Sequence, residues 1–338
     1  MGYRRLGRTE LMISEIVLGG HFNDPRGRHA WDRFTDDSLP ADVAANRADV
    51  VSKCLDYGIN YVDITNGAEA QAYGAALKGR RDRIYLAADD AQYAMRQDRN
   101  RNAESQMQSI ESCLRKLSTD HLDIWRPQFS HTGGHRDIDV QMCIDVFERA
   151  RQQGKVRFLG MSTHDRAWAQ HAIENFPQYM VAYIPYTLKS RVTPVDPRAI
   201  DRAQLYEPQG QESWLRDTRK GLFETARTHD TGIITTKPFS AGLVFSTPPQ
   251  GFGRPDAATE VDRELARLTL AYVLSNPDIS GVAVGMMLPQ HVDNNVRASF
   301  ERRNPLETSA VHRLQGTAER MWAQLPLEYQ WLRQWERV

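Results

Sequence analysis

Short apolar runs alternate with amphipathic stretches along most of this chain. Each run of three or four apolar residues has the length of a buried strand, and the stretch after it repeats apolar positions at the spacing of a helix. The predicted strands cover residues 16–18, 61–64, 84–87, 122–125, 157–160, 181–184, 233–235 and 282–284. The predicted helices cover residues 41–57, 69–78, 103–117, 138–153, 165–175, 218–229, 259–275 and 289–298.

Eight strands alternating with eight helices predict an α/β fold, a (β/α)8 TIM barrel. A doubly wound sheet is the alternative, but we would expect a G-x-G-x-x-G turn after an early strand of such a sheet, and the sequence has none. Long segments at 21–40, 188–217 and 243–258 follow predicted strands, so we expect them as long loops at the C-terminal face, where active sites form. With a further helix over 307–323, we expect one barrel domain over 1–338 and an extra C-terminal helix.

Charge and composition narrow the classes of partner. Lys+Arg and Asp+Glu both number 43, so the formal net charge is zero. A chain without a basic excess is a poor candidate for binding nucleic acid or an anionic membrane. No apolar run is long enough to span a bilayer, and no apolar stretch follows Arg4 and Arg5 as in a signal peptide. We therefore expect a cytoplasmic protein with a small-molecule substrate, and the oligomeric state stays open.

Seven motifs, in order, resemble bacterial aldo/keto reductases. They extend over nearly the whole chain, and although each is weak alone, their order and spacing are specific. The resemblance implies a (β/α)8 barrel and hydride transfer from NADPH to a carbonyl. The motifs are YRRLGRTEL at 3–11 with VLGG at 17–20, GINYVD at 58–63, RRDRIYL at 80–86, LRKLSTDHLDI at 114–124, GKVRFLGMS at 154–162, KPFSAG at 237–242, and VGM at 284–286 with the asparagines at 294–295.

The resemblance also implies four catalytic side chains, and only one is retained. In the family a tyrosine protonates the carbonyl oxygen, a lysine paired with an aspartate assists it, and a histidine orients the substrate. Asp63 matches the aspartate, but the segment after it is shortened and lacks the tyrosine; Tyr73 is expected to be a packed helix residue. Asp89 stands at the lysine position and Gln128 at the histidine position, with His131 three residues on. We therefore expect ordinary carbonyl reductase activity to be weak or absent.

The cofactor residues implied by the resemblance are also partly replaced. The expected cofactor is NADPH or NADH, with binding of neither as the alternative. No Arg or Lys follows the last strand to bind a 2′-phosphate, so we expect weak discrimination between the two. The candidate cofactor residues are Ser162, Thr163 in place of an asparagine, Tyr183 in place of a glutamine, Lys237 near a pyrophosphate or fixing its own loop, Gly285, and Asn295 on the adenine side.

Asp63 and Asp89 would be two carboxylates where the family has a salt bridge. Facing each other, they would share a proton or recruit a cation; alternatively Asp89 turns to solvent or pairs with an arginine. His131 has an ordinary pKa near 6.5, which suits proton transfer, unless it is only an exposed loop residue. A metal set of His21, His131 and His164 with one aspartate is the weaker hypothesis because its spacing matches no ligand motif, so we predict no metal.

Three functions are compatible with these residues. The first is a nicotinamide-dependent oxidoreductase with a non-standard acid, acting on a small carbonyl, hydroxyl or sugar-like substrate. The second is a non-redox lyase, dehydratase or isomerase that uses Asp63, Asp89 and His131. The third is a non-catalytic binding protein. The fold does not choose among them, and the resemblance places the first narrowly ahead.

Overall fold

The computed structural model describes most of the chain. The three long loops predicted at the barrel face, 21–40, 188–217 and 243–258, lie largely outside the described residues. Those residues are 1–22, 39–131, 134–192, 221–245, 259–301 and 307–338.

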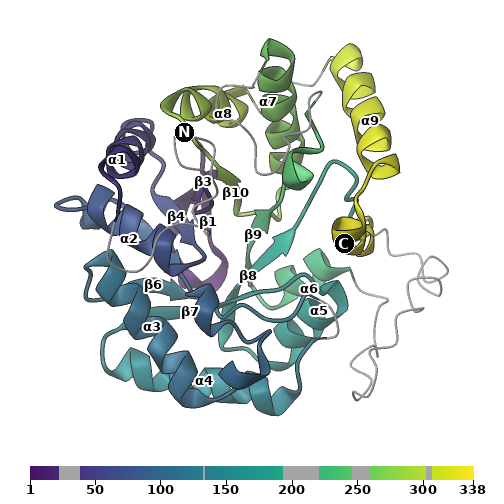
Figure 1. Ribbon diagram of the computed structural model, residues 1–338. Helices are drawn as coiled ribbons and strands as arrows, with labels where there is room; N and C mark the ends of the chain where they lie inside the picture. Colours follow the sequence, from purple (N-terminus) through teal and green to yellow (C-terminus); the bar gives the residue numbers. More distant parts are fainter. Residues whose placement is uncertain (23–38, 132–133, 193–220, 246–258, 302–306) are drawn as a thin grey trace.

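Eight parallel strands close into a barrel, which confirms the predicted fold class. They pair in the order β10-β3-β4-β5-β6-β7-β8-β9, and Figure 1 shows them enclosed by helices. Each predicted strand is present within two residues of its expected ends. The strands are β3 (Ile16–Gly19), β4 (Tyr61–Ile64), β5 (Tyr85–Ala88), β6 (Leu122–Trp125), β7 (Val156–Ser162), β8 (Tyr179–Pro185), β9 (Gly232–Thr236) and β10 (Gly281–Gly285).

The helices pack around the strands and follow the predicted order. In the part of the chain that the structure describes, none is long and apolar enough to cross a membrane. Among the apolar residues of the predicted helix 138–153, Ile138 is 68% exposed. The helices are α1 (Ala41–Asp56), α2 (Gly67–Ala76), α3 (Ala103–Leu117), α4 (Asp137–Gln152), α5 (Arg166–Asn175), α6 (Leu222–Thr228), α7 (Glu260–Leu274), α8 (Pro289–Glu301) and α9 (Thr308–Ala323).

Side-chain alternation along the strands decides which residues enter the barrel. On β4, Tyr61 belongs to the smaller apolar cluster inside the barrel, whereas Val62 and Ile64 belong to the larger cluster between strands and helices. Asp63 has the parity of Tyr61 and therefore points inward at the C-terminal end of its strand. On β6, Ile124 belongs to the same interior cluster.

A hairpin that the sequence analysis did not predict closes the other end of the barrel. It consists of β1 (Tyr3–Arg5) and β2 (Met12–Ser14), paired antiparallel. Leu6, Leu11 and Ile13 join the interior apolar cluster. Because this end is filled, the C-terminal ends of the strands form the face available for a site.

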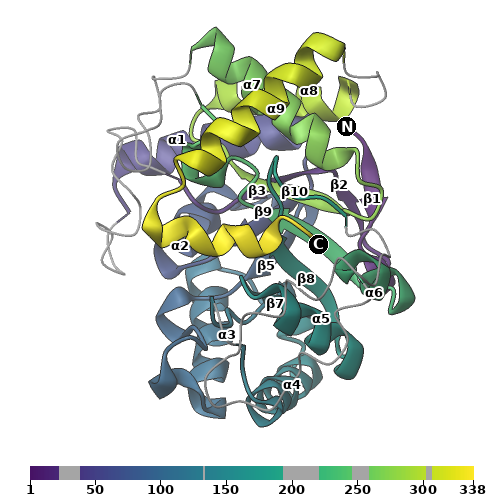
Figure 2. The ribbon, with the colours of Figure 1, turned by 90° about the vertical axis from the view of Figure 1, so that its right-hand side faces the viewer.

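The C-terminal segment returns to the mouth of the barrel. α9 packs against α7 and continues into a 3-10 helix, Leu327–Trp335, as Figure 2 shows. Trp335 is completely buried. The backbone of Arg191 pairs with Glu336 and Val338, so the end of the chain is fixed beside the segment that follows β8. The predicted extra C-terminal helix is therefore present as α9.

Candidate active site

Asp63 forms a buried ion pair with Arg126, which directly follows β6. Nε of Arg126 donates to Oδ1 of Asp63, and the two residues are 2% and 6% exposed. Burial raises the pKa of Asp63, and the charge of Arg126 opposes this effect. Because a guanidinium keeps its proton in proteins, the pair places a permanent positive charge beside Asp63.

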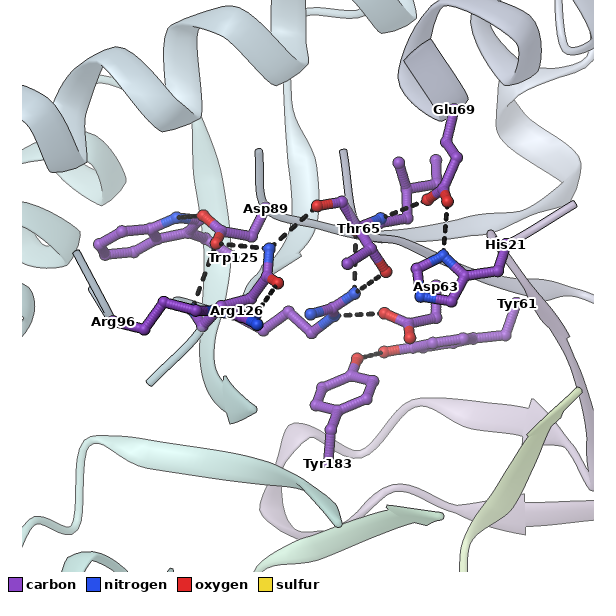
Figure 3. A network of polar contacts seen from close by, with 12 residues as sticks. His21, Tyr61, Asp63, Thr65, Glu69, Asp89, Arg96, Trp125, Arg126 and Tyr183 are labelled. Atoms are coloured by element: carbon purple, nitrogen blue, oxygen red, sulfur yellow. Dashed lines mark hydrogen bonds and ion pairs between the residues drawn. The ribbon is translucent and has the colours of Figure 1, made fainter. Parts of the chain in front are cut away.

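The guanidinium of Arg126 is held in a single place by its neighbours. Nη2 donates to the carbonyl oxygen of Ile64 and to Oγ1 of Thr65, both at 3.0 Å. The ring centre of Tyr183 lies 5.0 Å from the guanidinium carbon. Figure 3 shows Arg126 between Thr65 and Asp63. The family's aspartate thus has a cationic partner here, but that partner supplies charge and cannot transfer a proton.

Asp89 does not face Asp63, which corrects the predicted carboxylate pair. Asp89 follows the last residue of β5, and its carboxylate is held by groups of α3, β6 and the segment after β6. Oδ1 accepts from Oγ of Ser109 at 2.6 Å and from Nε1 of Trp125 at 3.2 Å. Oδ2 accepts from the backbone nitrogen of Gln128 at 3.2 Å. Burial raises the pKa of Asp89, and the hydrogen bond from Ser109 opposes it.

Gln128, at the family's histidine position, connects Asp89 to Arg96. Its Nε2 donates to Oδ2 of Asp89 at 3.1 Å and to the carbonyl oxygen of Thr65 at 2.9 Å. Its Oε1 accepts from Nη2 of Arg96 at 2.5 Å. Both ends of the amide are therefore occupied by protein groups. This arrangement orients the neighbours of Gln128, and a catalytic role for it stays a prediction.

A second buried carboxylate, Glu69 of α2, holds His21. Glu69 is completely buried; its Oε1 lies 2.5 Å from Nδ1 of His21, and its Oε2 accepts from the backbone nitrogen of Thr65 at 2.8 Å. The charge of His21 acts on Asp63, so the imidazole lies near the ion pair. Figure 3 shows His21 on the side of Asp63 away from Asp89. The carboxylate contact fixes the orientation of the ring.

The buried tyrosines near Asp63 are not poised as acids. The hydroxyls of Tyr61 and Tyr183 contact each other, and burial raises the pKa of both well above the ordinary value. Tyr73 is also completely buried, and its hydroxyl donates to the carbonyl oxygen of Gly19 at 3.3 Å. Tyr73 is therefore the packed helix residue that the sequence analysis expected.

His131 lies at the rim of the mouth between Arg96 and His164. Nη1 of Arg96 is 2.5 Å from Nε2 of His131, which must accept because a guanidinium only donates. The imidazole rings of His131 and His164 stack with their centres 4.3 Å apart. Partial burial and the charges of Arg96 and Lys237 lower the pKa of His131 to about 4. The ring is neutral at pH 7, so the argument from its ordinary pKa was wrong, while its catalytic role stays a prediction.

The C-terminal segment adds Trp331 to this stack. Its indole lies 4.1 Å from His164, with the ring planes only 3° apart. Nζ of Lys237 lies 5.7 Å from the centre of the same indole. Nε1 of Trp335 donates to the carbonyl oxygen of His164 at 2.8 Å and anchors the segment. Arg96, His131, His164, Lys237 and Trp331 together are called the mouth cluster below.

Four of the predicted cofactor residues lie at strand ends of the C-terminal face or in α8, and their roles stay predictions. Ser162 and Gly285 end β7 and β10, Lys237 follows β9, and Asn295 is buried in α8. A hydroxyl, an ammonium and an amide are the donors that an amide, a phosphate and an adenine require. A Cβ at Gly285 would lie 2.9 Å from the carbonyl oxygen of His21, so the backbone there is closely approached.

Two other predicted cofactor residues use their hydroxyls within the protein. Oγ1 of Thr163 donates to the carbonyl oxygen of Ser130 at 3.2 Å and accepts from the backbone nitrogen of Asp165 at 3.0 Å. The hydroxyl of Tyr183 contacts that of Tyr61. Any contact of Thr163 or Tyr183 with a cofactor would therefore involve other atoms of these residues.

Arg47 of α1 reaches the turn after β10, where the sequence itself offers no Arg or Lys. Its Nη1 donates to the carbonyl oxygen of Met286 at 2.9 Å and its Nη2 to that of Met287 at 2.5 Å. Its Nε donates to Oδ1 of Asn46 at 3.0 Å, and the residue is completely buried. All three guanidinium nitrogens of Arg47 thus donate to protein groups of this region, and these are the nitrogens with which an arginine would bind a phosphate.

The structure does not gather the histidines of the weaker metal hypothesis. His21 contacts Glu69, whereas His131 and His164 stack on each other. Over the described ranges, no group of three or more His, Cys, Asp or Glu side chains is placed to hold a metal ion.

Sequence reasoning missed two cations of the site, Arg126 and Arg96. Arg126 carried a usable signal, because it lies two residues after the interior residue Ile124 and so shares its side of the strand. Arg96 carried none, since it lies in the segment after β5, which has no periodic pattern. Only its contacts with Gln128 and His131 place it at the mouth.

Comparisons with known proteins agree with this fold. The chain is 22% identical to the uncharacterized oxidoreductase YqkF of Bacillus subtilis, over 90% of this chain and 92% of that protein. It is 24% identical to L-galactose dehydrogenase of Arabidopsis thaliana, over 88% of each chain. The holo form of aldo-keto reductase AKR11C1 from Bacillus halodurans superposes with a TM-score of 0.62 at 20% identity, covering 94% of this chain and 96% of that one. At that identity, the structural likeness shows the fold alone.

A sequence profile described as the Aldo/keto reductase family matches residues 33–318. This match spans most of the chain and includes every strand of the barrel except β3. The chain therefore belongs to the aldo/keto reductase family.

Proposed function

We propose that the protein is a nicotinamide-dependent oxidoreductase with a changed set of active-site residues. The observation that supports this most is the buried Asp63–Arg126 ion pair at the mouth of an aldo/keto reductase barrel. The family's aspartate has kept a cationic partner, although the lysine position is Asp89. The substrate class is a small carbonyl, hydroxyl or sugar-like molecule, and the likeness to a protein named L-galactose dehydrogenase supports the sugar-like member of that class.

NADPH or NADH would supply the hydride. Ser162, Gly285 and Asn295 would hold it, because a hydroxyl, a backbone N–H and a side-chain amide at or near the C-terminal face are donors for its polar groups. Lys237 belongs to the mouth cluster and is kept for the substrate side. Arg47 is committed to the turn after β10, which supports weak discrimination between the two cofactors.

Arg126 has the role of a fixed positive charge. Its contacts with Asp63, Ile64 and Thr65 hold the guanidinium in place before any substrate arrives. A preorganised charge in a water-poor site stabilises negative charge that develops on a substrate oxygen. Because Arg126 cannot give up its proton, another group must move one.

We assign the proton transfer to His21. The buried Glu69 carboxylate contacts Nδ1 and orients the ring, as a carboxylate does in many acid–base histidines. His21 lies near Asp63, as Figure 3 shows. Loss of a positioned acid of the family type lowers turnover by roughly 10²–10⁴-fold. We therefore expect ordinary aldehyde reduction to be slower than in typical family members by about that factor.

Transfer of deuterium from the cofactor tests this proposal even if turnover is slow. The protein is incubated with NADPH or NADH carrying deuterium at nicotinamide C4, together with a panel of small aldehydes and aldoses, and the products are analysed by mass spectrometry. We expect labelled alcohol with the wild type. With His21→Asn the rate of label transfer should fall at least about tenfold, because a positioned acid is lost. The matched control is His312→Asn, because His312 is exposed on α9.

The possible failures of this test have distinct meanings. Cofactor binding without any transfer of label would favour the non-redox alternative on the same barrel. Equal loss of transfer in His21→Asn and His312→Asn would remove His21 as the proton donor. Turnover at the rate of ordinary family members would mean that a standard acid is present and that the catalytic positions are assigned wrongly.

A further inference from the structure

The mouth cluster contains four basic side chains that influence one another and no carboxylate. The pKa of Lys237 is lowered to about 8 by burial and by the charge of Arg96. The pKa of His164 is lowered well below its ordinary value by burial and then by Lys237, His131 and Arg96. Every charge that acts on Lys237, His131 and His164 in the described residues is positive. Asp89 acts on Arg96, so the positive charge without a carboxylate among the described residues is that of Lys237.

Two nitrogens of the cluster are buried and have no partner. These are Nε of Arg96 and Nδ1 of His164, considered against the described residues only. A buried polar nitrogen without a hydrogen bond costs free energy, so native proteins rarely keep one without a use. Nζ of Lys237 makes a cation–π contact with Trp331, and the described residues offer it no carboxylate.

Contacts within the protein fix the side chains of the cluster, although His131 is exposed. Gln128 fixes one side of the Arg96 guanidinium, and His131 accepts from the other. Lys237 has a φ of 58°, a conformation that side chains with a Cβ rarely adopt and that often marks functional sites. Trp335 ties the Trp331 segment to His164. Arg96 and Lys237 are therefore held near each other although their charges repel.

We propose that Arg96 and Lys237, with His164 between them, bind the anionic group of the substrate, a carboxylate or a phosphate. The inference rests on the proposed oxidoreductase function and narrows its substrate class to carbonyl or hydroxyl compounds that carry such a group. Arg96 supplies the planar guanidinium that recognises a carboxylate or phosphate, and Lys237 supplies a point charge. The stacked rings of His131, His164 and Trp331 form an apolar wall beside the anion.

Binding of inorganic phosphate and of succinate tests the site without requiring turnover. Both anions are titrated calorimetrically at constant ionic strength, with chloride as the balancing ion, into the free protein and into protein saturated with NADPH. We expect saturable binding in both states. Arg96→Met and Lys237→Met should each weaken it by about 10- to 100-fold, the range for a hydrogen bond to a charged group. The matched controls, Arg151→Met and Lys155→Met, remove cations of ion pairs elsewhere on the surface and should leave binding unchanged.

Three results would overturn the inference. The first is no saturable binding of either anion. The second is equal weakening in the matched controls, which would indicate a general charge effect. The third is binding that disappears when NADPH saturates the protein, together with weaker NADPH binding in Arg96→Met, which would assign the site to the cofactor's phosphates. Arg96→Gln and Lys237→Gln, with circular dichroism, guard against misfolding. Anion binding without any nicotinamide binding would instead defeat the proposed function and leave the site intact.

Discussion

Charged side chains have partners of opposite charge on one side of the barrel mouth, whereas on the other side the described residues offer none. On the β4–β6 side, Asp63 is paired with Arg126, and Glu69 with His21. On the β7–β9 side, Lys237 and His164 have only positive neighbours in the described part of the chain. A complete network holds its members in fixed positions, whereas an incomplete one gains most from a ligand of the missing sign. We infer that the first side is the fixed part of the reaction site and that the second is the part that recognises the substrate.

The largest expected effect is a loss of stability when an ion pair on the β4–β6 side is broken. Arg126→Met should leave the Asp63 carboxylate buried without its cation and lower the free energy of unfolding by about 3–5 kcal/mol. Urea denaturation followed by circular dichroism measures this. Arg151→Met, on an exposed pair, should change stability by less than about 1 kcal/mol. A loss below about 1 kcal/mol in Arg126→Met would mean that the ion pair does not hold this side together.

A smaller effect is expected where the two sides meet. Gln128→Leu removes the amide that joins Asp89 to Arg96 and should cost about 1–3 kcal/mol of stability, the range for unpaired buried polar groups. It should also weaken phosphate binding, because Arg96 loses its support. Gln141→Leu, at an exposed amide on α4, is the control. Unchanged phosphate binding in Gln128→Leu would separate Arg96 from this network.

The last expected effect is a pH dependence of stability on the β7–β9 side. The pKa of Lys237 is about 8 in the folded protein, below its ordinary 10.5, so the folded state loses this proton first. The cost of keeping Lys237 charged is therefore full below pH 8 and is relieved as the pH rises towards 10.5. Relative to Lys237→Met, the wild type should gain stability between these values, as measured by urea denaturation at both. A constant difference between the two proteins would show that Lys237 keeps an ordinary pKa.

The barrel could be predicted because its signals are local. Each strand is a short apolar run with a helix after it, and the run at 61–64 matches β4 residue for residue. The N-terminal hairpin could not be predicted in this way, because β1 and β2 have three residues each, and β1 has no buried residue that would give it an apolar pattern. Burial of Leu6 and Ile13 depends on that closure, which no local pattern encodes.

The sequence predicted which strand ends carry the site residues, but it did not predict well which way their side chains point. Asp63 and Asp89 both lie at strand ends as expected, but Asp63 is inside β4, whereas Asp89 follows β5 and is oriented by its hydrogen bonds to other elements. Arg126 replaces the missing cation from another strand, which a position-by-position comparison with the family does not detect. The contact of Trp331 with His164 joins residues far apart in the chain and has no sequence signature.

Titration of the protein with NADPH and with NADH, followed by cofactor fluorescence and calorimetry, tests the central claim most directly. The account predicts that both bind and that their affinities differ by less than about tenfold, because a charge-assisted contact to the 2′-phosphate would be worth more than that. Lys155→Met, at an exposed pair, should bind both as the wild type does. A strong preference for NADPH would contradict the assignment of Arg47 to the turn after β10. Failure of both cofactors to bind would contradict the oxidoreductase itself.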